Sequence, residues 1–239
     1  MLESDALQEI GFNRAGGLLT ITLDRPQAKN ALTPAMLDAL SGILESNIDC
    51  RFVVIRGSEC GAFSSGFDLN QLGVGEERAA AGAALESALA ALEAYPRVTA
   101  AAVDGWCVGA GLELALCCDL RLATSRSHFY LPAATLGVSY PEHGLRRLLA
   151  CAGRPAALRI ALLAEKWSAE DAHQAGIVHE VSDDLDRLIE DWFANVKMGD
   201  PEAIANMKYG LTTLGRRGNR DLAAPERCSH VSAVLAMDQ

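Results

Sequence analysis

The chain has 239 residues, of which half are hydrophobic, and it carries a net charge of −10 at neutral pH. This length and composition fit one domain, or one domain with a smaller appendage, built around a sizeable core. The acidic balance argues against nucleic acid or an anionic membrane surface as a partner, because both would repel the chain.

The first two thirds of the chain alternate between strand and helix patterns. Residues 7–26 predict two strands around a turn at Gly16 and Gly17. Residues 32–46 predict a helix, because Thr33 can cap it and apolar residues then recur at helical spacing. The order continues with a buried strand at 51–57, a loop at 58–75, a helix at about 78–94, a strand at 98–105, a turn at Gly109 that opens a helix, and a strand at 119–125.

After about residue 150 the strand signal almost disappears. The remaining sequence predicts mostly helices, with one short strand near 176–181. Strand-then-helix units followed by helices indicate the α/β fold class, with an α/β core and a helical C-terminal part.

The seven cysteines form an odd set without metal-ligand spacing: Cys50, Cys60, Cys107, Cys117, Cys118, Cys151 and Cys228. They are typical of small buried hydrophobic residues in a reducing cytosol, and we expect no metal site. The first twelve residues contain neither a basic start nor an apolar run, and two glutamates interrupt the alanine-rich tract at 79–94. We therefore expect a cytoplasmic protein without a signal peptide or a membrane partner.

Two glycine-containing loops each follow a predicted strand. The first, CGAFSSGFDL, spans 60–69, and the second, VGAGLE, spans 108–113 at the start of a predicted helix. A helix N-terminus offers unpaired N–H groups, and small residues let a ligand approach them closely. Two such loops at one sheet edge can direct two backbone N–H groups at a single oxygen, which makes an oxyanion hole. Taken singly, each loop is also typical of ordinary strand-to-helix packing.

Four segments in register resemble the enoyl-CoA hydratase/isomerase (crotonase) superfamily: ITLDRPQAKNAL at 21–32, AFSSGFDL at 62–69, TAAAVDGWCVGAGLELALCCDLRLAT at 99–124 and WSAEDAHQAGIVHEV at 167–181. The resemblance implies a crotonase-like spiral of ββα units over residues 1–180. It also implies a helical oligomerisation region at 181–239, shorter than is usual in the family, and a homotrimer or hexamer. The implied substrate is an acyl-CoA or acyl-carrier thioester, with coenzyme A as part of the substrate and no tightly bound cofactor.

The resemblance also assigns roles to individual residues. The two oxyanion N–H donors fall at Phe67 and Ala110, and Glu113 matches the first catalytic glutamate of the hydratases. The binding candidates for the CoA thioester are Ala28 and Lys29, where the family meets the adenine and phosphates, together with Ser65, Gly66, Asp68 and Gly109 in the two loops. Glu113 follows Ala110 by one helical turn, which directs its side chain back towards the oxyanion site.

The resemblance places the second hydratase glutamate at position 133, where this chain has Ala133. Hydration of an enoyl thioester needs a base for water and an acid for the α-carbon, and one glutamate cannot fill both places. The following segment, GVSYPEHGLRRLL at 137–149, offers Tyr140, Glu142 and His143 as candidates for a second functional group. Alternatively, Glu142 and His143 are exposed first-turn residues of a helix, where a glutamate suits the helix dipole.

The sequence thus favours an enzyme that stabilises a thioester enolate, first of all a hydratase or dehydratase with Glu113 as the acid/base. A decarboxylase of a malonyl-type thioester, an enoyl-CoA isomerase, and a catalytically weak thioester-binding or assembly homologue remain as alternatives. The apolar neighbours of Glu113 in sequence predict a half-buried carboxylate with a raised pKa, whereas the helix dipole favours its ionised form.

Overall fold

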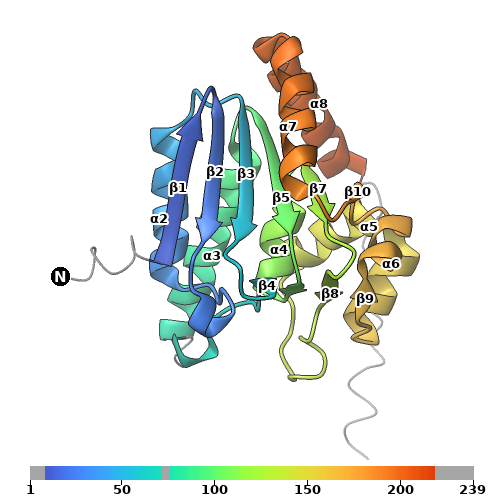
Figure 1. Cartoon of the computed structure of the whole chain (residues 1–239). Helices are drawn as coiled ribbons and strands as arrows, with labels where there is room; N and C mark the ends of the chain where they lie inside the picture. Colours follow the sequence, from blue (N-terminus) through green and yellow to red (C-terminus); the bar gives the residue numbers. More distant parts are fainter. Residues whose placement is uncertain (1–8, 72–75, 219–239) are drawn as a thin grey trace, which may run out of the picture.

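The computed structural model describes residues 9–71 and 76–218, and for 214–218 only the backbone. A six-stranded sheet forms the centre of the molecule (Figure 1). Its strands, in spatial order, are β1 (Ile10–Ala15), β2 (Leu18–Leu23), β3 (Phe52–Gly57), β5 (Val98–Val103), β7 (Leu120–Ala123) and β10 (Glu180–Val181). β1 and β2 form the predicted antiparallel hairpin, and the other neighbouring strands pair in parallel.

A second, smaller sheet is formed mainly by short strands that come after strands of the large sheet in the chain. Its strands, in spatial order, are β4 (Ala62–Ser64), β6 (Trp106–Val108), β8 (His128–Tyr130) and β9 (Trp167–Ser168). β4, β6 and β8 each come directly after a strand of the large sheet and before a helix, which confirms the repeated ββα unit. The prediction missed all four strands, and the loop expected at 58–75 contains β4. Strands of two or three residues are too short to show a period.

Helices cover both faces of the large sheet. Alternate residues of β3 and β5 face α2 (Pro34–Ser46), α3 (Glu76–Ala94) and α4 (Ala110–Cys117) on one side, and α7 (Leu185–Met198) on the other (Figure 1). Because both faces are covered, β3 consists almost entirely of buried apolar residues, as the sequence predicts. Thr33 caps α2 by accepting a hydrogen bond from the N–H of Met36, also as predicted.

The remaining elements are α5 (Glu142–Leu162), α6 (Ala169–Gln174), α8 (Pro201–Gly218) and two single turns of 3-10 helix, η1 (Pro26–Ala28) and η2 (Leu69–Gln71). Gly153 interrupts α5 with φ 68° and ψ 169°. A capping box between Ser168 and Asp171 starts α6. α7 and α8 make up the helical C-terminal region, and residues 219–239 lie outside the described part of the chain.

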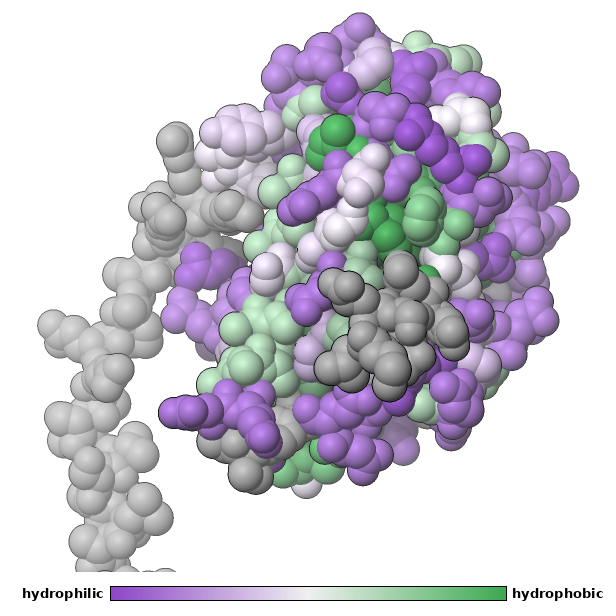
Figure 2. All heavy atoms as spheres, turned by 90° about the vertical axis from the view of Figure 1, so that its left-hand side faces the viewer, coloured by the Kyte–Doolittle hydropathy of each residue, from purple (hydrophilic) through white to green (hydrophobic). Residues whose placement is uncertain are grey.

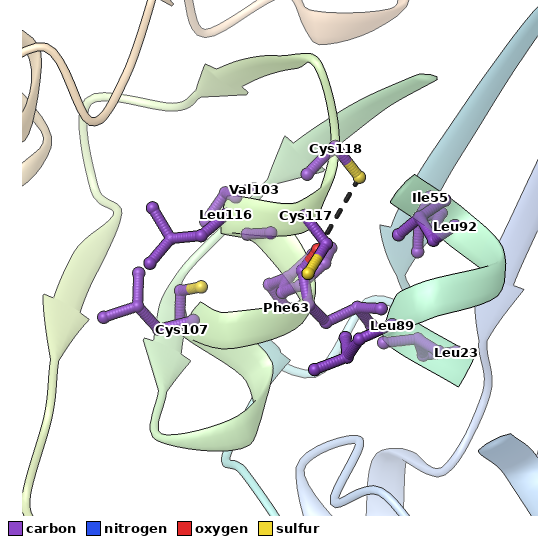
Figure 3. Packing of buried hydrophobic residues seen from close by; sticks show 14 of the residues in the cluster. Leu23, Ile55, Phe63, Leu89, Leu92, Val103, Cys107, Leu116, Cys117 and Cys118 are labelled. Atoms are coloured by element: carbon purple, nitrogen blue, oxygen red, sulfur yellow. Dashed lines mark hydrogen bonds between the residues drawn. The ribbon is translucent and has the colours of Figure 1, made fainter. Parts of the chain in front are cut away.

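Most of the cysteines in the described part of the chain are small core residues, whereas Cys60 and Cys151 are only partly buried. Cys107, Cys117 and Cys118 are buried among leucine and phenylalanine side chains (Figure 3). Burial raises the pKa of the Cys118 thiol to about 12, so it stays protonated. Cys228 lies outside the described residues.

Two further observations concern the surface. In the ranges 9–71 and 76–218, no helix is long and apolar enough to cross a membrane. The face that carries β1 and α2 is mainly hydrophilic with smaller apolar patches between (Figure 2), and Phe12 and Ile48 are about half exposed.

Gly105 gives a direct test of how the two sheets meet. Its φ is +79°, and a Cβ there would lie 2.1 Å from the carbonyl oxygen of Gly61, so Gly105→Ala meets both backbone strain and a backbone clash. We expect the free energy of unfolding to fall by about 2 kcal/mol or more in urea titrations. Gly82→Ala in α3 is the control, because nothing lies within 4 Å of its Cβ position and the helix gains about 0.5–1 kcal/mol. Equal stabilities of the two variants would contradict this packing.

Candidate active site

Two glycines, Gly109 and Gly111, flank Ala110 at the N-terminus of α4. Gly109, the residue before the helix, has φ 54° and ψ −118°, a conformation that glycine adopts readily. Gly111 packs so closely against the preceding loop that a Cβ there would lie 2.6 Å from Cβ of Ser64. The first turn of α4 therefore presents its backbone, rather than side chains, to the loop after β4.

The two loops singled out in the sequence converge at this point. Gly66 has φ +101°, and a Cβ at this position would lie 3.5 Å from the amide nitrogen of Ala110. Within the ranges that the structure describes, the N–H groups of Phe67 and Ala110 have no hydrogen-bond acceptor. The geometry thus brings two free backbone donors from separate ββα units into one neighbourhood.

The segment around η1 joins the same neighbourhood through its backbone. Ser65 donates its N–H to the carbonyl of Lys29 at 3.0 Å and its hydroxyl to the carbonyl of Ala28 at 3.2 Å. Leu32 bonds to the carbonyl of Gly66, and Asp68 bonds back to the carbonyl of Leu32. The expected CoA-contacting residues and the expected oxyanion loop are therefore neighbours.

Arg25 and Asn30 hold this arrangement, and the sequence reasoning missed both. Arg25 donates to Asp68 at 2.9 Å and to Glu9 at 2.7 Å. Asn30 is fully buried and donates to the carbonyl of Ala62 at 2.9 Å. A buried polar side chain is tolerated when its donors and acceptors form hydrogen bonds. The partners of Asn30 come from a distant segment, so this pairing becomes apparent only in the fold.

Glu113 is buried, with 2% of its surface exposed, and three side chains contact its carboxylate. The Tyr140 hydroxyl donates to Oε2 at 2.9 Å, and Nη1 of Arg147 donates to Oε1 at 3.0 Å. Nε2 of His143 lies 3.9 Å from Oε1. The sequence predicts a half-buried carboxylate, and the side chain is buried more deeply than that. Polar side chains of α5 and of the segment before it, rather than the apolar neighbours in α4, meet the carboxylate.

The pKa of Glu113 reflects these opposing influences. Burial raises it above the ordinary glutamate value, while the hydrogen bond from Tyr140 and the positive charge of Arg147 act in the opposite direction. The pKa of Tyr140 is raised well above its usual value, by burial first and then by the adjacent carboxylate. At neutral pH Tyr140 is therefore protonated, and its hydroxyl donates a hydrogen bond to Glu113.

The other predicted candidates differ in whether they contact Glu113. Ala133, in place of the second glutamate, packs against the core and leaves no acid there. His143 contacts Glu86 of α3 at 2.7 Å. Glu142 is exposed and pairs with Arg146 one turn further on, at 2.6 Å, so it does not join the group around Glu113.

Glu86, Glu113 and His143 each offer a possible metal-ligand atom, and these atoms lie within 4.8 Å of one another. The guanidinium of Arg147 donates to both carboxylates, at 3.0 Å to Glu113 and 3.1 Å to Glu86. This fixed cation supplies the positive charge between the two carboxylates. A cavity of about 550 Å³ lies beside the group, between α3, α4, α5 and α8.

Comparisons with known proteins show to which family this fold belongs. The family model for enoyl-CoA hydratase/isomerase matches residues 13–212. The chain belongs to the enoyl-CoA hydratase/isomerase (crotonase) family.

Three relatives illustrate the range of this family. A 2,3-dehydroadipyl-CoA hydratase from Escherichia coli is 35% identical over 73% of this chain and 69% of its own length. A human ethylmalonyl-CoA decarboxylase is 31% identical over 82% of this chain and 67% of its own. The structure of a putative enoyl-CoA hydratase from Thermobifida fusca in complex with CoA superposes with a TM-score of 0.80 at 28% identity, over 90% and 88% of the two chains.

The hydrogen bond from Tyr140 makes a pH-dependent prediction. Since burial raises the folded-state pKa of Glu113, the protonated form favours folding, and this contribution is lost as pH rises through that pKa. Tyr140→Phe removes a hydrogen bond that stabilises the carboxylate, so the folded-state pKa rises further. We expect a loss of about 1–3 kcal/mol in the free energy of unfolding at pH 8, and a smaller loss near pH 4.5.

Urea titrations at the two pH values measure this difference. Tyr130→Phe is the matched control, because its hydroxyl makes only a long, exposed contact of 3.4 Å with Thr135. An equal loss at both pH values in Tyr140→Phe would show that its hydroxyl does not sense the charge of Glu113.

Proposed function

We propose that the protein is an acyl-CoA-processing enzyme of the hydratase/dehydratase type, with Glu113 as its acid/base and a backbone oxyanion hole. The observation that carries this proposal is the pair of N–H groups at Phe67 and Ala110 without an acceptor among the described residues, with the buried carboxylate of Glu113 one helical turn after Ala110. Coenzyme A would enter as part of the substrate thioester, and no tightly bound cofactor is required.

The thioester carbonyl oxygen would accept hydrogen bonds from Phe67 and Ala110. Negative charge develops on this oxygen when the enolate forms, so two preorganised donors lower the barrier more than they strengthen substrate binding. The α4 dipole adds to the effect at the Ala110 position.

Glu113 and Tyr140 would divide the proton transfers of hydration. The oxygen of a water molecule bonds to the β-carbon, and the proton that it loses goes to the Glu113 carboxylate. The enolate then takes a proton at its α-carbon from the Tyr140 hydroxyl. The existing hydrogen bond of 2.9 Å lets Glu113 return its proton to the tyrosine oxygen. Tyr140 thus takes the place of the acid that Ala133 lacks.

Decarboxylation of a malonyl-type thioester is the second candidate. It needs the oxyanion hole and one proton for the α-carbon, but no base for water. The replacement of the second glutamate by Ala133 and the similarity to a human ethylmalonyl-CoA decarboxylase support this alternative.

We also propose that the protein forms a homotrimer or a hexamer and works in the cytoplasm. Exposed apolar side chains at the end of α5 and in α8 support association with further copies; they include Leu162, the following Leu163, Met207 and Leu211.

Ala110→Pro tests the oxyanion hole. Proline is well tolerated at the first position of a helix, where Ala110 lies, but it has no N–H to donate. We expect a loss of roughly 10²-fold or more in kcat with crotonyl-CoA. Ala110→Gly keeps the N–H group and should retain most of the activity. Near-complete activity in the proline variant would remove Ala110 from the site.

Glu113→Gln tests the acid/base. The amide keeps the shape of the side chain but cannot exchange the proton, so kcat should fall by about 10² to 10⁴ while acyl-CoA binding hardly changes. The assays follow loss of the enoyl absorbance of crotonyl-CoA and release of CO2 from methylmalonyl-CoA. Glu77→Gln, in the exposed first turn of α3, is the control. Unchanged turnover of crotonyl-CoA in Glu113→Gln would make Glu113 structural, whereas release of CO2 from methylmalonyl-CoA without turnover of crotonyl-CoA by the wild type would favour the decarboxylase.

A further inference from the structure

Arg147 lies at the centre of the charged group behind the candidate active site. It belongs to the second turn of α5, and only 9% of its side chain is exposed. Its guanidinium contacts three glutamates from two other helices, namely Glu86 and Glu93 of α3 and Glu113 of α4. An arginine fork is suited to this task because its donors are fixed in one plane.

Arg147 donates one hydrogen bond to Glu113 and several to the glutamates of α3. Nη1 donates to Oε1 of Glu113 at 3.0 Å, whereas Nε donates to Glu93 at 2.7 Å and Nη2 donates to Glu86 at 3.1 Å. Because α3 holds the guanidinium from the other side, the group cannot rotate away from Glu113 without breaking two ion pairs. Tyr140 occupies Oε2, so both oxygens of Glu113 have a fixed partner.

We propose that Arg147 is a positioning residue for the acid/base: it fixes the orientation of the Glu113 carboxylate and keeps it ionised in a buried place. This inference rests on the proposed function of Glu113. Arg147 itself would touch no reacting atom, and it would act only through the carboxylate.

The local charge balance supports this role. The charged and titratable groups that face Glu113 or His143 are Glu86 and Glu93 of α3, Cys117 of α4, Tyr140 before α5, and Arg146 and Arg147 of α5, with Asp119 further along the cavity wall. Three carboxylates therefore share one permanently charged, buried cation. Without it, Glu113 would be buried beside two other acids, and its ionised form would be strongly disfavoured.

A purely structural role is the competing explanation. Arg147 also joins α5 to α3, so its loss would destabilise the fold even if Glu113 were unaffected. The two explanations differ in the pKa of Glu113 and in the pH dependence of turnover, which a structural contact would not change.

The experiment compares Arg147→Gln and Arg147→Lys with the wild type. An opposite charge at this distance lowers a carboxylate pKa by about 1–3 units, so Arg147→Gln should raise the pKa of Glu113 by that amount. NMR of protein with ¹³C-labelled glutamate side chains, with Glu113 assigned through Glu113→Gln, measures this value without turnover. The acidic limb of the kcat profile for crotonyl-CoA should move to higher pH by the same amount.

At neutral pH, kcat should fall by about 10- to 100-fold in Arg147→Gln, because both the charge and the orientation of Glu113 are lost. KM should change little, since the CoA-contacting segment around η1 is untouched. Arg147→Lys restores the charge without the fork and should recover part of kcat and most of the pKa. Arg146→Gln is the control, because Arg146 pairs with the exposed Glu142 and not with Glu113.

A pKa of Glu113 that stays at the wild-type value in Arg147→Gln would overturn the proposal, whatever happens to the melting temperature. If Arg147→Gln does not fold, Glu93→Gln removes one anchor of the guanidinium without touching Glu113. Loss of that negative charge should lower the pKa of Glu113, whereas loss of the anchor should lower kcat on the pH plateau where Glu113 is ionised. A wild-type plateau kcat in that variant would also overturn the proposal. Wild-type turnover in Glu113→Gln would refute the proposed function separately, since the NMR measurement does not depend on the reaction.

Discussion

The site depends on keeping one carboxylate, Glu113, charged inside the protein. Transfer of a carboxylate from water to the interior is unfavourable unless hydrogen bonds and opposite charges replace its hydration. Tyr140 and Arg147 supply these partners from the other side of the site. The pKa of Glu113 nevertheless stays above the ordinary value because burial outweighs them. A buried carboxylate with a raised pKa, held by a hydroxyl and a guanidinium, is suited to exchanging a proton with a substrate.

The ββα repeat explains why this carboxylate lies next to free backbone donors. Each repeat ends a strand of the large sheet, adds a short strand to the small one, and then starts a helix or loop at the same edge. Gly66 and Gly111 let two of these turns approach closely: a Cβ at Gly66 would lie 3.0 Å from the carbonyl oxygen of Val108, and one at Gly111 would lie 2.6 Å from Cβ of Ser64. The donors therefore come from main chain, whose position the sheets determine, while Glu113 comes from the helix that starts at one of them.

Much of this arrangement was predictable from the sequence. The long strands and helices have clear periods, and Glu113 follows the GAG turn at a spacing that places it over the helix start. What the sequence could not provide were contacts between distant segments. Nothing in the pattern around 147 pairs Arg147 with α3, since the partners are about sixty residues earlier. The two-residue strand β9 and the buried pairing of Asn30 were missed for the same reason: neither has a local signature.

A crystal structure of the protein with an unreactive analogue of crotonyl-CoA tests the account most directly. We predict that the thioester oxygen lies about 3 Å from the amide nitrogens of both Phe67 and Ala110, with the Glu113 carboxylate within hydrogen-bond reach of a water placed to attack the β-carbon. An analogue bound with its thioester oxygen away from these two N–H groups, or with Glu113 remote from the α- and β-carbons, would contradict the central claim.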